Sequence, residues 1–206
     1  MDQKQYKSML LSQLYAPFQK CTLCPLGSLG RKNVVFGSGN PDADMLLIGE
    51  GPGREEDEQG LPFVGRSGKL LTKILESLSI QRKELYIANV VKCRPPNNRA
   101  PLPNEVLVCK ETLLEKQIDI IKPKVICTLG ASALNALLGK TNAITKSRGT
   151  FTSFKGIPVL PAYHPAYILR SPKKMPFLAQ DLQTAFNKTM AENVTPKTQL
   201  KQATFF

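Results

Sequence analysis

Four short apolar runs, separated by stretches with helical periodicity, constrain the fold of this chain more than any other feature. The runs lie at residues 44–49, 85–91, 124–129 and 157–162. Between the first two, apolar residues recur three and four positions apart over residues 67–79, as in an amphipathic helix. Alternation of this kind is typical of a parallel sheet covered on both faces. We therefore predict an α/β fold with three layers, α/β/α, around a central four-stranded, mostly parallel sheet.

Further helices are predicted at both ends of the chain and after the later runs. They cover residues 1–20, 104–121, 130–138 and 176–191, and Asn104 is the predicted N-cap of the second. A length of 206 residues suits one domain of ordinary size. We predict a single domain over residues 1–192 and a loose C-terminal tail over residues 193–206.

The composition favours a polyanionic partner and excludes a membrane span. The chain has 28 Lys and Arg against 16 Asp and Glu, a formal net charge of +12. Nucleic acid is the commonest partner of such a surplus, although a basic tail or a solubility feature is the alternative. No apolar run reaches the roughly 18 residues of a membrane helix, and the N-terminus does not resemble a secretory signal. We expect a cytoplasmic protein.

Four of the five cysteines form a pattern that predicts a metal site. Cys21 and Cys24 form a C-x2-C pair, and Cys93 and Cys109 lie farther apart in the later sequence. A four-thiolate site for zinc or a [4Fe–4S] cluster fits these spacings, with the wide second spacing favouring the cluster, and unrelated free thiols are the alternative. Cys127 lies inside an apolar run and is interpreted as a small buried side chain.

Polar residues stand where the predicted strands end, and ligands of such sheets bind beyond the carboxyl ends of the strands. Glu50 follows the first run, Asn89 lies near the end of the second, and His164, the single histidine, follows the fourth. Each also has a structural interpretation, such as a backbone cap for Asn89. Phe63 fits a core aromatic equally well, and the acidic residues 55–57 are interpreted as a solvated loop.

The segments around these residues resemble the iron–sulfur uracil-DNA glycosylases, often called family 4. The matching segments are GEGPG with the following Glu56 and Asp57, PFVGRSG, NVVKCRPPNNR, KPKVI and HPAYILR, preceded by C-x2-C. They occur in the family's order from about residue 21 to residue 170. The resemblance implies an enzyme that flips deoxyuridine out of DNA and hydrolyses its N-glycosidic bond, the step that starts base excision repair.

The resemblance also implies a role for each candidate residue. The catalytic residues would be Glu50 and His164. The uracil-binding residues would be Gly51, Phe63 and Asn89. The DNA-binding residues would be Lys92, Arg94 and Arg170 on phosphates, with Ile168 or Leu169 filling the gap left in the duplex. The four cysteines, Cys21, Cys24, Cys93 and Cys109, would hold a [4Fe–4S] cluster. The partner would be uracil-containing DNA, single- or double-stranded, and the enzyme a monomer.

Three other functions remain open from the sequence. A non-catalytic DNA-binding protein with a redox-sensing cluster would bind DNA and release no base. A zinc-containing nucleotide hydrolase, suggested by the glycine-rich segment after the first run, would cleave free nucleotides. A related glycosylase with hypoxanthine or broader specificity is the third, and Asn89 favours uracil over it.

Overall fold

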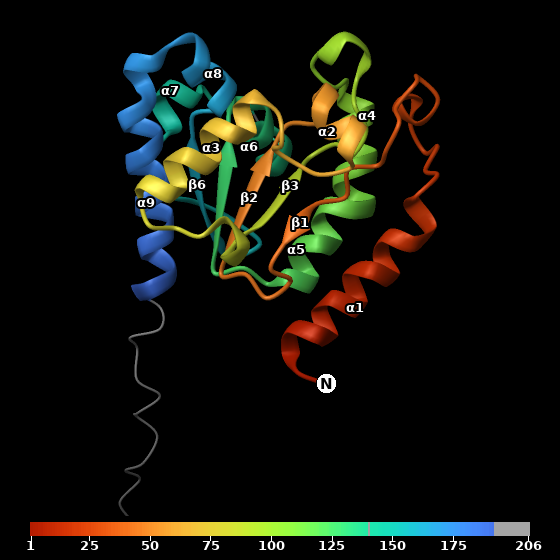
Figure 1. The fold of residues 1–206 in the computed structure, drawn as a ribbon, viewed down its shortest axis with the longest axis horizontal. Coiled ribbons are helices and arrows are strands. Elements are labelled where there is room, and N and C mark those ends of the chain that lie inside the picture. The colour runs from red at the N-terminus through yellow and green to blue at the C-terminus, as the bar shows by residue number, and fades with distance from the viewer. Residues whose placement is uncertain (140, 192–206) are drawn as a thin grey trace, which may run out of the picture.

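A central sheet of six strands organises the computed structural model, which describes residues 1–139 and 141–191 (Figure 1). The strand order is β1-β3-β2-β4-β6-β5. The strands are β1 (Ser38–Gly39), β2 (Met45–Gly49), β3 (Tyr86–Asn89), β4 (Val125–Leu129), β5 (Thr152–Phe154) and β6 (Ile157–Ala162).

The four inner strands β3, β2, β4 and β6 pair in parallel, which confirms the predicted parallel core. The predicted number of four strands is wrong, because β1 and β5 add an antiparallel strand at each edge. These edge strands are two and three residues long and are not buried, so neither has the apolar run that marks a strand in the sequence.

Helices cover both faces of the sheet, as the three-layer prediction requires (Figure 1). One hydrophobic core lies between the sheet and α3, α8 and α9, and another lies between the sheet and α1, α5 and α6. The helices are α1 (Gln3–Tyr15), α2 (Arg54–Gln59), α3 (Arg66–Ser77), α4 (Pro103–Cys109), α5 (Glu115–Ile121), α6 (Ala131–Leu138), α7 (Ile144–Ser147), α8 (Pro165–Arg170) and α9 (Met175–Ala191).

The helix predicted over residues 104–121 differs from the prediction at its start and in its middle. It begins at Pro103, and its N-cap is Leu102 rather than Asn104. The carboxylate of Glu105 accepts a hydrogen bond from the Leu102 N–H at 2.7 Å, which supplies the cap. A π-helical turn, Lys110–Leu114, separates α4 from α5 directly after Cys109.

Two segments predicted as loops contain short helices, and the first helix is shorter than predicted. α2 follows β2, and α8 follows β6 with His164 as its N-cap and Pro165 at its first position. α1 ends at Tyr15 instead of continuing to residue 20. None of the described helices has both the length and the apolar character needed to cross a bilayer. The predicted tail, residues 193–206, lies outside the described residues.

Candidate active site

A cavity of about 210 Å³ opens at the carboxyl ends of β2, β3 and β6. It contains the five predicted catalytic and uracil-binding residues, which come from three separate segments of the chain. Its lining consists of Glu50, Gly51, Pro52, Gly53, Glu56, Phe63, Ser67, Asn89, Pro95, Asn98, Arg99, His164 and Ala166.

Asn89 forms the polar wall of this cavity. It is the last residue of β3 and lies opposite Gly49 in the parallel register. Its side chain is buried, with 2% of the residue exposed, and its Oδ1 has no hydrogen-bond partner among the described residues. A buried acceptor without a donor costs on the order of 1–3 kcal/mol. The oxygen therefore has an unmet need for a donor, at a residue that lines the cavity.

Phe63 provides the apolar wall, held in an unusual backbone conformation. Its φ of 53° lies in the left-handed region, which a residue with a bulky side chain rarely adopts. Gly68 allows this, because a Cβ there would lie 2.0 Å from the Phe63 carbonyl oxygen. At Gly49 a Cβ would lie 2.6 Å from the Phe63 ring and 2.4 Å from Asn89 Oδ1. The two glycines thus let the aromatic ring and the amide approach the same small space.

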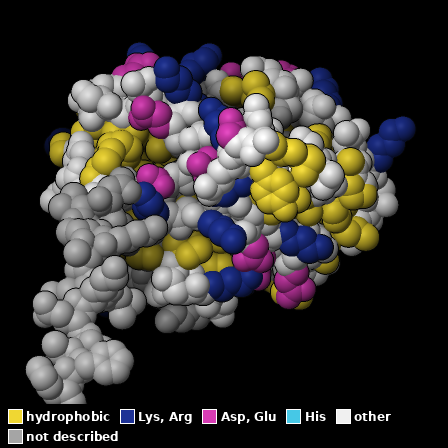
Figure 2. All heavy atoms as spheres, turned by 90° about the horizontal axis from the view of Figure 1, so that it is seen from below, with side chains coloured by type: hydrophobic (Ala, Val, Ile, Leu, Met, Phe, Trp, Pro, Cys, Tyr) yellow, Lys and Arg dark blue, Asp and Glu magenta, His cyan; other side chains and the backbone are white. Residues whose placement is uncertain are grey.

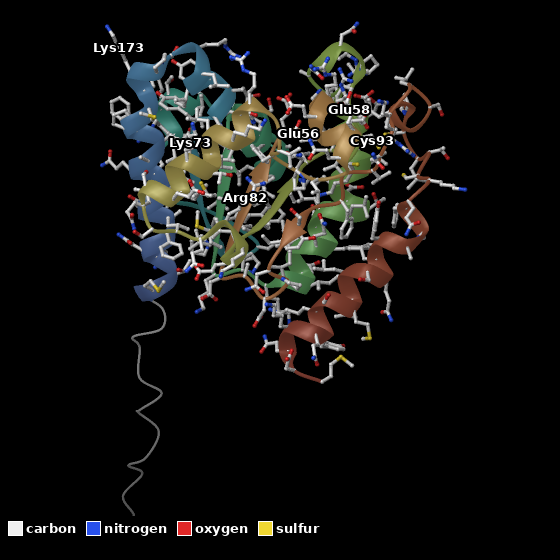
Figure 3. The ribbon with its side chains drawn as sticks, in the orientation of Figure 1. Glu56, Glu58, Lys73, Arg82, Cys93 and Lys173 are labelled. Carbon is white, nitrogen blue, oxygen red and sulfur yellow. The ribbon has the colours of Figure 1, made fainter. Side chains whose placement is uncertain are left out.

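Glu56 holds the loop between β2 and α3 in shape. Its Oε1 accepts hydrogen bonds from the backbone N–H groups of Val64 and Gly65 at 3.0 and 2.8 Å. Its Oε2 accepts from the Gly53 N–H at 3.1 Å. Figure 3 labels Glu56, which lies on α2, above the sheet. The interpretation of Glu56 as part of a solvated loop is wrong, and its place three residues after the Gly53 N-cap was the available signal.

Asp57, interpreted in the same way, is also buried. Its Oδ1 accepts from the backbone N–H groups of Lys32 and Asn33 at 2.9 and 3.1 Å. Asn33 returns a hydrogen bond from its Nδ2 to the Asp57 carbonyl oxygen at 2.6 Å. These bonds attach the segment that follows Cys21 and Cys24 to α2, and so to the wall of the cavity.

His164 reaches the cavity from the start of α8. Its Nδ1 accepts a hydrogen bond from the Ala166 N–H at 3.1 Å, so a neutral ring carries its proton on Nε2. Burial and the nearby Arg170 cation lower the pKa of His164 to about 4. The ring is therefore neutral at pH 7 and acts as an N–H donor. It lies 5.7 Å from the Phe63 ring, centroid to centroid.

Glu50 stands directly after β2 and lines the same cavity as Asn89 and His164. Its carbonyl oxygen accepts from the Val91 N–H at 3.1 Å, which extends the pairing of β2 and β3 by one step. Its side chain also borders a neighbouring cavity of about 470 Å³, formed by residues of α4 and α6. The carboxylate thus stands between the polar cavity and a larger, more open one.

Three of the predicted DNA-binding residues are accessible. Arg170 and Leu169 lie at the exposed end of α8, and 39% of Leu169 is exposed. Arg94 is half-buried, and its Nε donates to Asn98 Oδ1 at 2.7 Å. Asn98, the partner of Arg94, lines the cavity, and so does His164, the N-cap of the helix that ends in Leu169 and Arg170.

The side chains of Lys92 and Ile168 lie inside the protein, away from the surface that their predicted roles on DNA require. Lys92 is fully buried, and its Nζ donates to the Asn89 carbonyl oxygen at 2.8 Å and to Gln117 Oε1 at 2.6 Å. Burial lowers its pKa to about 7. An ammonium group in this position cannot reach a phosphate. Ile168 is 2% exposed and packs in the core with α3 and α9, so it cannot enter a duplex.

A residue pair that the sequence analysis missed fixes the other rim of the cavity. Arg99 lines the cavity and forms a two-pronged ion pair with the buried Glu105, at 2.9 and 2.7 Å. The guanidinium lowers the pKa of the Glu105 carboxyl. Glu105 also caps α4. A Glu three residues after the N-cap, here Leu102, is the sequence pattern that could have predicted this role.

The four predicted metal ligands gather on one side of the sheet. Cys93 and Cys109 are buried, and Cys21 and Cys24 are half-buried. Burial, with a smaller contribution from the other three thiols, raises the pKa of Cys93 to about 12. Such mutual effects require that the four sulfurs lie near one another. Cys127, in contrast, is buried in the core on the opposite face of the sheet, as predicted.

The four cysteines provide the ligand type that a four-thiolate metal site needs. They come from three parts of the chain: the segment after α1, the segment after β3 and the end of α4. Zinc and iron–sulfur centres both take thiolate ligands. Within the described residues, no group of three or more His, Cys, Asp or Glu side chains is arranged to hold one metal ion.

Comparison with known proteins assigns the family. The family model described as the uracil DNA glycosylase superfamily matches residues 36–191. A type-4 uracil-DNA glycosylase of Thermotoga maritima is 53% identical over 155 residues, which cover 74% of this chain and 80% of that protein. Type-4 uracil-DNA glycosylases of Sulfurisphaera tokodaii and Saccharolobus solfataricus are 42% and 41% identical, each over 86% of this chain and over 82% and 85% of their own. This chain belongs to the uracil-DNA glycosylase superfamily and, within it, to the type-4 uracil-DNA glycosylases.

Proposed function

We propose that this enzyme flips deoxyuridine out of DNA and hydrolyses the bond between uracil and deoxyribose. The observation that carries the proposal is the buried Oδ1 of Asn89, which lacks a partner among the described residues and belongs to a residue that lines the same cavity as Phe63. Its relatives are named as uracil-DNA glycosylases, and the net charge of +12 suits DNA.

The amide of Asn89 selects uracil by its hydrogen-bonding edge. Uracil offers an N3–H donor and an O4 acceptor, which match the Asn89 oxygen and NH2 group. Cytosine presents the reverse pattern and would leave the buried amide mismatched. Sites of this kind reject the wrong partner by about 10⁴-fold, because their polar groups stay unpaired. Phe63 stacks on the base and excludes water from the amide.

Bond cleavage leaves positive charge on the sugar and negative charge on uracil. Each of the two catalytic residues stabilises one of these charges. Glu50 stabilises the positive charge that develops on the sugar and orients the attacking water. His164, which is neutral at pH 7, donates its Nε2–H to the uracil oxygen that becomes negative. The low pKa of His164 means that the ring acts by hydrogen bonding and not by transferring a proton.

The mouth of the cavity holds the DNA backbone. Arg94 and Arg170 contact phosphates, and the exposed Leu169 fills the gap that the flipped nucleotide leaves. Binding is therefore expected to weaken steeply with salt. The substrate is uracil-containing DNA, single- or double-stranded. The monomeric state and the cytoplasmic location stay predictions.

Cys21, Cys24, Cys93 and Cys109 would hold a [4Fe–4S] cluster. Bound there, the cluster would cross-link the N-terminal segment to the end of β3 and to α4, without taking part in the reaction. Cys109→Ala is expected to abolish the visible absorbance of the purified protein, whereas Cys127→Ala is the matched control and should retain it. Loss of absorbance in Cys127→Ala would overturn the choice of ligands.

A cleavage assay tests the main proposal. Oligonucleotides with one uracil or one cytosine are incubated with the enzyme and then heated in alkali, which breaks the strand at an abasic site. We expect cleavage at uracil alone, and we expect Asn89→Ala to lower its rate by about 10²- to 10³-fold without lowering the melting temperature. An intact uracil strand at high enzyme concentration would overturn the proposal.

A further inference from the structure

Lys92 occupies the junction between the cysteine set and the cavity. It is fully buried one position before Cys93, which Figure 3 labels, and three positions after Asn89. Its Nζ donates to the Asn89 carbonyl oxygen at 2.8 Å and to Gln117 Oε1 at 2.6 Å. Burying a lysine away from both solvent and the cavity is costly, so its hydrogen bonds inside the protein must compensate for the burial.

The hydrogen bond to Asn89 connects the last residue of β3 to the interior of the protein. Asn89 is buried, and its carbonyl oxygen needs a donor. The Lys92 ammonium provides it. Gln117 holds that ammonium from α5, and its Nε2 donates in turn to the Phe36 carbonyl oxygen at 2.9 Å. The peptide that carries the Asn89 side chain is thereby fixed to the body of the protein.

The same lysine adjoins the cysteine set. It is joined by a peptide bond to Cys93, one of the four predicted ligands. No Asp or Glu among the described residues forms an ion pair with Lys92. Its side chain is therefore held by its two hydrogen bonds, to Asn89 and to Gln117.

We propose that Lys92 is a positioning residue that couples the four-cysteine site to the uracil-reading amide of Asn89. Its peptide bond to Cys93 connects it to the cysteine site, and its hydrogen bonds hold the end of β3. Losing either hydrogen bond lets the amide turn from the orientation that uracil requires. This inference rests on the proposed function, because it assumes that Asn89 reads the base.

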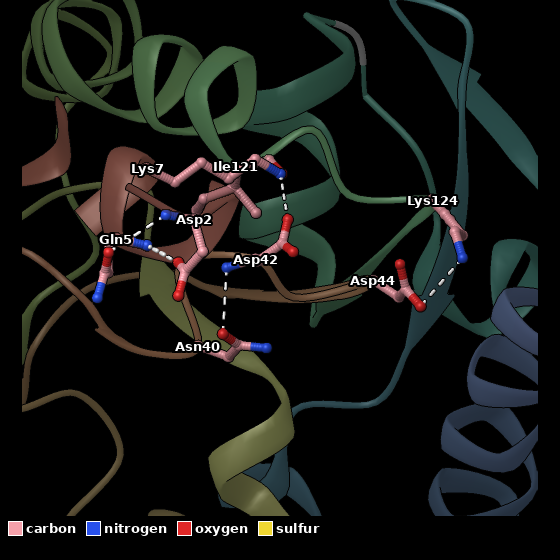
Figure 4. A network of polar contacts seen from close by, with 8 residues as sticks. All are labelled: Asp2, Gln5, Lys7, Asn40, Asp42, Asp44, Ile121 and Lys124. Carbon is pink, nitrogen blue, oxygen red and sulfur yellow. Dashed lines mark hydrogen bonds and ion pairs between the residues drawn. The ribbon is translucent and has the colours of Figure 1, made fainter. Parts of the chain in front are cut away.

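The chain contains a matched control for the loss of a buried lysine. Lys7 is 7% exposed, and its Nζ donates to Asp42 Oδ1 and to the Ile121 carbonyl oxygen, both at 2.6 Å (Figure 4). It makes two hydrogen bonds, as Lys92 does, but at the opposite end of the sheet. Lys7→Met therefore reports what the removal of a buried ammonium does to stability alone.

A double-mutant cycle tests the coupling. Single-turnover cleavage of uracil DNA is measured for the intact protein, Lys92→Met, Asn89→Ala and the double variant. We expect Lys92→Met to lower the rate by about 10- to 100-fold, because a small misplacement of a reading group has effects of that size. In the Asn89→Ala background, the same substitution should change the rate by less than about twofold, since coupled residues are not additive. Lys7→Met should leave the rate within twofold of the starting protein.

Two readouts besides activity accompany the cycle. Lys92→Met should weaken binding of free uracil about tenfold or more, with affinity for uracil-free DNA unchanged. It should also shorten the lifetime of the visible absorbance under an iron chelator, which Lys7→Met should not do. Lys92→Arg, which retains the charge and the donors, should recover part of the uracil affinity.

The outcomes separate this inference from the proposed function. If Asn89→Ala cleaves uracil DNA normally, the assignment of Asn89 fails and the inference fails with it. If Asn89→Ala is impaired and Lys92→Met is not, or if their effects simply add, only the inference is overturned. If Lys92→Met yields no folded protein, the cycle is repeated with Gln117→Met, and additive effects there overturn the inference equally.

Discussion

The two ends of the sheet differ in whether their buried polar groups have hydrogen-bond partners. At the amino end, Lys7 is paired with Asp42 and with a backbone carbonyl, and Lys124 donates to Asp44 at 3.1 Å (Figure 4). At the carboxyl end, Asn89 keeps a buried oxygen without a partner among the described residues, and Phe63 has a left-handed φ. Both departures cost stability.

The difference indicates which end was selected for stability and which for binding. The lower end of the molecule, shown in Figure 2, has acidic and basic side chains mixed with hydrophobic ones, a pattern of an ordinary surface. Unpaired buried polar atoms and strained backbone conformations lower stability, and proteins retain them mainly at functional sites. The following predictions test whether the departures at the carboxyl end belong to function.

Gly49→Ala should have the largest effect. The added methyl group would lie 2.4 Å from Asn89 Oδ1 and 2.6 Å from the Phe63 ring, so both must move. We expect the single-turnover rate on uracil DNA to fall by about 100-fold or more. Circular dichroism should show a folded protein. Normal cleavage by this variant would mean that the base does not bind between the amide and the ring.

Glu56→Gln should lower both stability and rate. The carboxylate accepts three backbone hydrogen bonds, and an amide opposes at least one of them with its own N–H groups. We expect the free energy of unfolding to fall by about 2 kcal/mol. Cleavage should fall about tenfold as the loop that carries Phe63 loosens.

Glu58→Gln is the matched control on the same helix. Glu58 pairs only loosely with Lys32, at 3.8 Å, and Figure 3 labels it beside Glu56. Its replacement should change the unfolding free energy by less than about 0.5 kcal/mol, as is usual for an exposed ion pair. Equal losses in the two variants would show that Glu56 acts through helix charge and not through its three hydrogen bonds.

The pH dependence of stability should reveal the lowered pKa of His164. Its pKa is lowered from 6.5 to about 4 on folding, so between these values the unfolded chain binds a proton that the folded chain does not. Stability therefore rises as the pH increases from 4 to 6.5, by on the order of 2 kcal/mol from this residue. Denaturant titrations at several pH values should show a shallower rise for His164→Gln. Parallel curves would contradict the lowered pKa.

Thr128→Val should have the smallest effect, and in the opposite direction. Thr128 Oγ1 is also buried without a partner among the described residues, but it does not line the cavity. Replacing the hydroxyl with a methyl group should raise the unfolding free energy by up to about 1 kcal/mol. Cleavage should be unchanged. A drop in cleavage would mean that unpaired polar atoms at this end of the sheet act together.

The sequence predicted the features that depend on neighbouring residues. β6 has the predicted bounds, and Glu50, Asn89 and His164 were found because a polar residue after an apolar run is a local signal. The edge strands β1 and β5 were missed, because their pairing partners are distant in the sequence.

The direction of a side chain was the main feature that the sequence did not predict. Lys92 and Arg94 are two positions apart and both are basic, yet Lys92 points into the core and Arg94 does not. Likewise Ile168 packs inward from α8 while Leu169 is exposed. These outcomes depend on which neighbouring element offers an acceptor or an apolar surface, and Gln117 of α5 is the acceptor for Lys92.

The unpaired oxygen of Asn89 also bears on how the proposed reaction cycle ends. Free uracil keeps the N3–H donor of the nucleotide, so the hydrogen bond that we propose for selection would survive bond cleavage. The product leaves only when it gives up that bond and returns the oxygen to its unpaired state. Accumulated free base should therefore slow the enzyme, and repeated turnover should be limited by product departure rather than by bond breaking.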